Sequence, residues 1–67
     1  MRFYTYEGPD ENRRPVRLHI DLATVVAVHE IASGEVYLEG ESVSWTIRPD
    51  PGAIPGLLGA WQMARAR

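Results

Sequence analysis

The chain has 67 residues and a mass of 7.5 kDa, which suffices for one domain. Its 45% hydrophobic and 24% charged residues are typical of a globular protein and exclude a disordered, collagen-like or coiled-coil chain. The formal charge of −2 is opposite to the basic balance of most nucleic-acid-binding domains, and the absence of cysteine excludes disulfides and thiolate-bound zinc.

The first half of the chain predicts three strands. Residues 2–7 are rich in aromatic and β-branched side chains and end at the turn formers of residues 8–12. Residues 16–21 alternate apolar and polar side chains, the period of two that marks a half-buried strand. A short turn over residues 21–24 leads to a third strand over residues 25–31, which carries apolar side chains on both faces.

The second half predicts two more strands. A hairpin turn at residues 32–35 precedes a fourth strand over residues 36–39. A reversal at residues 40–41 leads to a fifth strand over residues 42–47. The three prolines within residues 49–55 cannot donate ladder hydrogen bonds, so the sheet ends there.

A C-terminal helix is predicted from Pro55 onward. Its apolar side chains fall on one helical stripe: Leu57, Leu58, Trp61 and Ala64. The short connections between the strands favour an antiparallel order. We therefore predict an α+β fold for residues 1–67: a single small domain with an antiparallel meander of about five strands and one C-terminal helix packed on one face.

The alternation within the strands assigns side chains to two faces of the sheet. The helix-facing side is predicted to hold Phe3, Val16, Leu18, Ile20, Val26, Val28, Val36, Leu38, Val43, Trp45 and Ile47, with Trp45 and Trp61 in the core. The uncovered side is predicted to hold Tyr4, Tyr6, Arg17, His19, His29, Tyr37, Glu39, Ser44 and Thr46. Three exposed tyrosines on one face are typical of a protein interface, and the alternative is that they only cover the second face of the sheet through cross-strand packing.

The chain contains no recognisable catalytic, cofactor or metal motif. His19, Asp21 and His29 are potential ligands, but their spacing matches no closed zinc site. The serines lie outside nucleophile motifs, and the glycines are scattered among turns. We expect a protein that is not an enzyme and binds no cofactor or metal. Since no segment is similar to a signal peptide or a membrane span, we also expect it to be soluble and cytoplasmic.

The function predicted from these features is a non-enzymatic protein-interaction module. Its expected partner-binding residues are Tyr4, Tyr6 and Tyr37 together with Glu35, Glu39 and Glu41. The acidic side chains would select a basic partner surface by charge complementarity, and the alternative is that they form an ordinary solubilising rim. In size, acidity and lack of catalytic motifs, the chain resembles the small inhibitor proteins encoded by phages and mobile elements, including anti-CRISPR proteins. This resemblance of composition implies an inhibitor or accessory role.

An alternative function is that of a nucleic-acid-associated accessory protein. Arg13, Arg14 and Arg17 form a basic cluster before and within the second predicted strand, where they could bind backbone phosphates. Asp10 and Glu11 stand directly before this cluster and oppose phosphate binding. Nucleic acid is therefore the less favoured partner.

The first predicted strand also indicates self-association. Residues 3–6 contain no inward charge, proline or glycine that would protect a sheet edge against pairing. A chain of this length hides little surface on folding. We therefore predict a homodimer, formed through this edge or through the tyrosine-bearing face.

Overall fold

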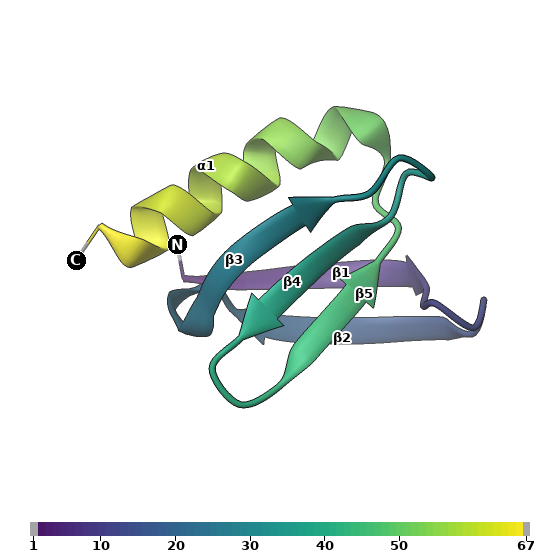
Figure 1. Cartoon of the computed structure of the whole chain (residues 1–67), viewed down its shortest axis with the longest axis horizontal. Helices are drawn as coiled ribbons and strands as arrows, with labels where there is room; N and C mark the ends of the chain where they lie inside the picture. Colours follow the sequence, from purple (N-terminus) through teal and green to yellow (C-terminus); the bar gives the residue numbers. More distant parts are fainter. Residues whose placement is uncertain (1, 67) are drawn as a thin grey trace.

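The computed structural model describes residues 2–66, which form five strands, two short 3₁₀ helices and one α-helix. In chain order the elements are β1 (Phe3–Pro9), β2 (Pro15–Asp21), η1 (Leu22–Thr24), β3 (Val25–Glu30), β4 (Val36–Gly40), β5 (Ser44–Ile47), η2 (Pro51–Ala53) and α1 (Ile54–Arg65). Every strand pair is antiparallel (Figure 1). The predicted fold class, α+β with antiparallel strands and a C-terminal helix, is confirmed.

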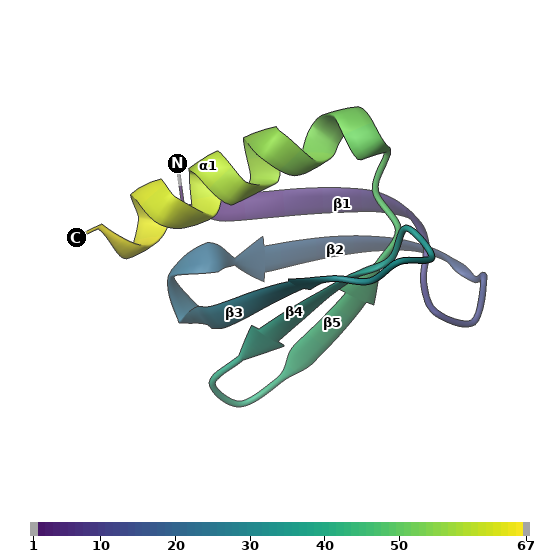
Figure 2. The same ribbon diagram turned by 45° about the horizontal axis from the view of Figure 1, so that its top comes forward.

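The five strands divide into two sheets, β1–β2 and β3–β4–β5. The tight turn of η1 lies at the division. The Asp21 side chain accepts a hydrogen bond from the Ala23 N–H (3.1 Å), and the Thr24 hydroxyl donates to the Asp21 carbonyl oxygen (2.8 Å). These bonds turn the chain at the end of β2, so β3 begins the second sheet. The two sheets cross, with the core between them (Figures 1 and 2).

Helix α1 runs along the open side between the β1 edge and the β3 edge (Figures 1 and 2). The Trp61 indole N–H and the Arg65 guanidinium both donate to the Val25 carbonyl oxygen, at 2.8 and 2.9 Å. These bonds satisfy a backbone acceptor on an edge strand. The helix thus closes the side of the core that the sheets leave open. No helix within residues 2–66 is long and apolar enough to cross a lipid bilayer.

The core draws on all five strands, η1 and α1. It consists of eight buried side chains: Tyr6, Ile20, Leu22, Val25, Val36, Leu38, Ile47 and Leu57. Trp45 and Trp61, which were predicted to lie in the core, pack against this cluster while remaining partly exposed. Burial of apolar side chains from all five strands, η1 and α1 is what holds so short a chain together.

In β1 the predicted orientation of the side chains is wrong. Phe3, assigned to the core, is 57% exposed, whereas Tyr6, assigned to the uncovered face, is 4% exposed. Tyr4 is half-buried against the core. The register places Tyr4 opposite Ile20 and Tyr6 opposite Leu18, and residues opposite each other share a face. This orientation buries two aromatic rings, where the predicted one would bury a single ring.

Two valines assigned to the core are also exposed. Val26 is 44% exposed because a β-bulge between Val25 and Ala27 shifts the alternation, so that Val25 is buried instead. Val43 is 55% exposed because it lies in the turn before β5, outside the ladder. Neither irregularity is visible in a count of alternating residues.

We expect Leu57→Ala to lower the free energy of unfolding by about 2–5 kcal/mol, because truncating a buried leucine loses apolar contact and leaves a cavity. Leu57 is 1% exposed, whereas Met63 on the same helix is 66% exposed. Met63→Ala should therefore change the free energy by no more than about 0.5 kcal/mol. Urea titration followed by far-UV circular dichroism measures both. Equal effects would contradict the packing of α1 described above.

Candidate functional site

A groove of about 280 Å³ follows one edge of β1. One side is lined by the six consecutive residues from Tyr4 to Pro9, and the other by residues 48–50 and Ala53. Successive side chains of a strand point to opposite faces, so a groove that touches six in a row follows the strand's edge. The groove therefore lies between β1 and the segment that leads from β5 into α1.

The ends of the β1–β2 hairpin determine which backbone groups bond across it. At one end the Leu22 N–H donates to the Arg2 carbonyl oxygen, and at the other the Asp10 N–H donates to the Arg14 carbonyl oxygen, both at 2.9 Å. Hydrogen-bonded and non-bonded pairs alternate along an antiparallel ladder. The residues of β1 with even numbers therefore bond to β2, and those with odd numbers direct their backbone groups away from it.

The backbone N–H and C=O groups of Thr5 and Glu7 consequently point to the outer edge of β1. Within residues 2–66, no other strand pairs with this edge, and no backbone bond outside the ladders involves Thr5 or Glu7. Residues two apart on a strand lie about 7 Å apart. The groove is thus bordered by evenly spaced donors and acceptors that a further strand could use.

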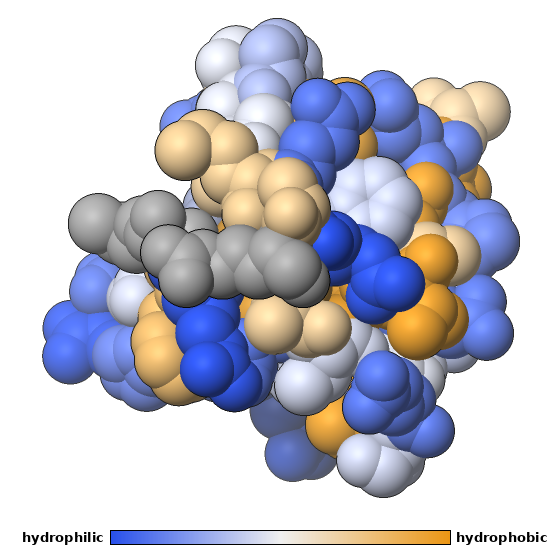
Figure 3. Space-filling view, turned by 90° about the vertical axis from the view of Figure 1, so that its left-hand side faces the viewer, coloured by the Kyte–Doolittle hydropathy of each residue, from blue (hydrophilic) through white to orange (hydrophobic). Residues whose placement is uncertain are grey.

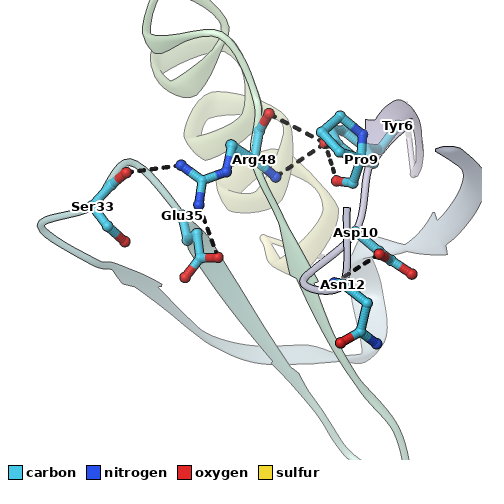
Figure 4. A network of polar contacts seen from close by, with 7 residues as sticks. All are labelled: Tyr6, Pro9, Asp10, Asn12, Ser33, Glu35 and Arg48. Carbon is cyan, nitrogen blue, oxygen red and sulfur yellow. Dashed lines mark hydrogen bonds and ion pairs between the residues drawn. The ribbon is translucent and has the colours of Figure 1, made fainter. Parts of the chain in front are cut away.

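Tyr6 joins the two sides of the groove (Figure 4). The Arg48 N–H donates to the Tyr6 hydroxyl (3.1 Å), and the hydroxyl donates to the Pro9 carbonyl oxygen (2.7 Å). The same hydroxyl lies 3.2 Å from the Arg48 carbonyl oxygen. The ring covers Gly8 so closely that a Cβ at this position would lie 2.7 Å from the hydroxyl oxygen. These contacts fix the segment after β5 against β1.

The charged side chains around the groove are largely paired. The Arg48 guanidinium donates to the Ser33 carbonyl oxygen (3.0 Å) and to Glu35 Oε2 (3.1 Å), which fastens the β3–β4 turn (Figure 4). Glu7 forms an ion pair with Arg17 at 2.9 Å. Asp50 is exposed and makes no side-chain cap bond at the start of η2. Among the described residues that line the groove, Asp50 is the charged one without an ion pair.

The three tyrosines predicted to bind a partner do not share a face. Tyr4 and Tyr6 line the groove from the inner side of β1. Burial raises the pKa of Tyr4, with a smaller contribution from Tyr6. Tyr37 lies on the outer face of the other sheet, 5.5 Å from His29 between ring centroids. The expected tyrosine-bearing face does not form, because β1 presents its other side to the core.

The three predicted acidic residues are likewise dispersed. Glu35 precedes β4 and is engaged with Arg48. Glu39 lies within β4, and its carboxylate is 3.3 Å from the His29 imidazole. Glu41 lies in the turn between β4 and β5, at the far end of β4 from Glu35. The role of these residues in partner binding stays a prediction, but they do not form one acidic rim.

The predicted basic cluster is divided as well. Arg13 and Arg14 are exposed in the β1–β2 loop and form no ion pair within the described part of the chain, whereas Arg17 is paired with Glu7. Asp10 Oδ1 shapes this loop by accepting two backbone N–H groups, each at 2.8 Å. The guanidinium groups of Arg13 and Arg14 are therefore available to a binding partner at the hairpin tip.

The potential metal ligands lie apart. His19 Nδ1 contacts the Thr5 hydroxyl at 3.2 Å, and His29 belongs to the other sheet. Asp21 is engaged by Arg2, whose hydrogen bonds hold the pKa of that carboxyl below its usual value. No group of three or more histidine, cysteine, aspartate or glutamate side chains gathers within residues 2–66.

A second hollow, of about 400 Å³, lies at the end of the molecule near the N-terminus of β1. It is lined by Arg2, Ala23, Glu41, Ala64 and Arg65. Two of these side chains are already engaged, Arg2 with Asp21 and Arg65 with the Val25 carbonyl oxygen. Figure 3 shows this end of the molecule, where separate hydrophobic patches lie among hydrophilic side chains. The β1 groove, with its open backbone groups, is the stronger candidate site.

Comparison of the chain with protein-family models, curated proteins and solved structures finds no match. The assignment of the groove as a candidate site therefore depends on its geometry alone. Sequence reasoning identified the unprotected edge of the first strand but not the opposite side, formed by Arg48, Pro49 and Asp50. Pro49 was a usable signal, because a proline directly after a strand turns the chain out of the ladder.

We expect Tyr6→Phe to lower the free energy of unfolding by about 1–2 kcal/mol, because the part-buried Arg48 N–H loses its acceptor. Tyr37→Phe is the matched control, since Tyr37 lies on an outer sheet face, and should change the value by about 0.5 kcal/mol at most. Urea titration gives both numbers. If the two variants were equally stable, the Tyr6 hydroxyl would not hold the sides of the groove together.

Proposed function

We propose that the protein is a non-enzymatic protein-binding module that acts as an inhibitor or accessory subunit of another protein. The observation that carries this proposal is the open β1 edge beside its groove. Unpaired backbone groups of an edge strand are a template for another chain, and natural proteins usually cover or disrupt such edges. Here the edge borders a groove that a partner segment could fill.

Phe3 lies on the same strand, one residue before the part of β1 that lines the groove. It stands on β1 with 57% of its surface exposed, and the Arg2 guanidinium lies 5.7 Å from the centre of its ring. Exposed aromatic side chains supply much of the binding energy at protein interfaces. An aromatic ring beside open backbone groups therefore suits a partner that is held by both.

We expect the immobilised full-length protein to retain a partner from a lysate of its source organism in a saturable complex. Phe3→Ala should weaken this complex by about tenfold or more, because truncating an interface aromatic typically removes at least about 1.4 kcal/mol. Val43→Ala is the control, since Val43 is similarly exposed but lies in the β4–β5 turn rather than on β1. Titration calorimetry with the purified partner measures both. Failure to retain any saturable partner would contradict the proposal.

A second candidate function is nucleic-acid binding, favoured by the exposed arginines at the β1–β2 hairpin tip. Arg13 and Arg14 form no ion pair with the rest of residues 2–66. If they bind phosphates, affinity should fall with salt on a log–log slope of about 0.7–0.9 for each phosphate neutralised. A mobility-shift titration at low salt tests this, with the double variant Arg13→Ala, Arg14→Ala as control. No shift at protein concentrations of tens of micromolar would exclude this function.

A further inference from the structure

We infer that the β1 groove binds an extended, basic segment of another protein, which adds as a strand to the free edge of β1. This inference rests on the proposed protein-binding function and names its site and the chemistry of the partner. It depends on the backbone groups of the edge, on the residues that border the groove and on the exposed Asp50 carboxylate.

The length of the edge suits a short strand. The groove is lined by β1 from Tyr4 to Pro9, a run of about 17 Å at the usual rise of a strand. Thr5 and Glu7 each offer an N–H and a C=O to a chain lying there. A segment of about five residues can therefore bond through its main chain, and its alternate side chains would stand beside those of Thr5 and Glu7.

The surroundings favour a single extended chain over a second copy of this protein. In a dimer paired through β1, the incoming strand would carry its own β2 on its far side. That space is bordered by residues 48–50 and by Ala53. A lone strand needs only about 4.8 Å beside β1. The homodimer expected from the sequence is thus the less favoured occupant of this edge.

The charge of the groove selects a basic segment. Arg48 is paired with Glu35, and Glu7 with Arg17, which leaves the exposed Asp50 carboxylate opposite the free edge. A lysine or arginine of the added strand would compensate Asp50. On the outer face of the sheet, Glu7 lies beside Arg17 of β2. A basic side chain of the added strand, on the other side of Glu7, would complete a row of three charges with alternating sign.

A direct test uses a capped peptide of alternating threonine and arginine, titrated into the full-length, isotope-labelled protein. We expect the amide resonances of Thr5, Glu7 and Asp50 to shift, and hydrogen exchange at Thr5 and Glu7 to slow. A peptide with glutamate in place of arginine should bind about tenfold or more weakly. A peptide with alternate backbone nitrogens methylated should lose binding by a similar factor, because its side chains are kept but its donors are removed.

Two pairs of variants locate the site. Thr5→Pro removes a donor that faces the groove without breaking the β1–β2 ladder, and should weaken binding of the arginine peptide about tenfold. His19→Pro makes the same change at the opposite edge of the same sheet and should have no effect. Asp50→Asn should weaken binding about fivefold or more, whereas Glu41→Gln, with the same change in net charge outside the groove, should not. Thermal unfolding checks that each variant is folded.

Equal binding of the methylated and unmethylated peptides would overturn the inference, as would resonance shifts confined to another surface or the absence of any shift. Light scattering addresses the second copy: a mass near twice 7.5 kDa that returns to the monomer value in Thr5→Pro would assign the edge to self-association instead. If the partner retained from a lysate binds Thr5→Pro as well as the parent chain, protein binding survives and the strand-addition site is wrong. If no partner is retained, the proposed function itself fails.

Discussion

The arrangement of this small protein depends on how one buried hydroxyl finds hydrogen-bond partners. The Tyr6 ring belongs to the core, where a phenol without a partner would be costly. Its hydroxyl bonds to the backbone of Arg48 and Pro9, so one side chain connects the first sheet to the chain that leaves the second. The position of η2 and the start of α1 follows from this connection. The groove beside β1 is the space left between the two connected parts.

The ion pairs around this framework lie at the surface. Arg2 pairs with Asp21, Glu7 with Arg17, and Arg48 with Glu35. Exposed pairs of this kind contribute little to stability. Their effect is on the surface potential, because they neutralise one another and leave particular charges uncompensated. Among the charges within residues 2–66 that take part in none of these pairs are Asp50 at the groove and Arg13 and Arg14 at the hairpin tip, which lie at separate places on the surface.

The sequence predicted the elements better than the orientation of their side chains. The strict alternation of residues 16–21 determined β2 and its buried side, and the prolines after β5 marked the end of the sheet correctly. In β1 both alternating sets contain an aromatic residue, Phe3 on one side and Tyr4 with Tyr6 on the other. The choice between them is made by hydrogen bonds to Arg48, a residue 42 positions away, which no local pattern contains. The bulge after Val25 lies where the Trp61 indole of α1 donates to the Val25 carbonyl oxygen, a contact that no local pattern contains either. For the same reason, the sequence predicted the β1 side of the groove but not the side formed by residues 48–50.

The close approach of the Tyr6 ring to Gly8 divides the residues of β1 into those that tolerate substitution and those that do not. Any side chain at position 8 would displace the Tyr6 ring and, with it, the segment that carries Asp50. Gly8 and Tyr6 therefore cannot be substituted independently of each other. Thr5 and Glu7, directed outward, can be replaced at little expense to the core. A lineage of such proteins could therefore exchange the residues that a partner meets while keeping the intervening ones fixed. In that sense the alternation of the strand separates what evolution can adjust from what it must preserve.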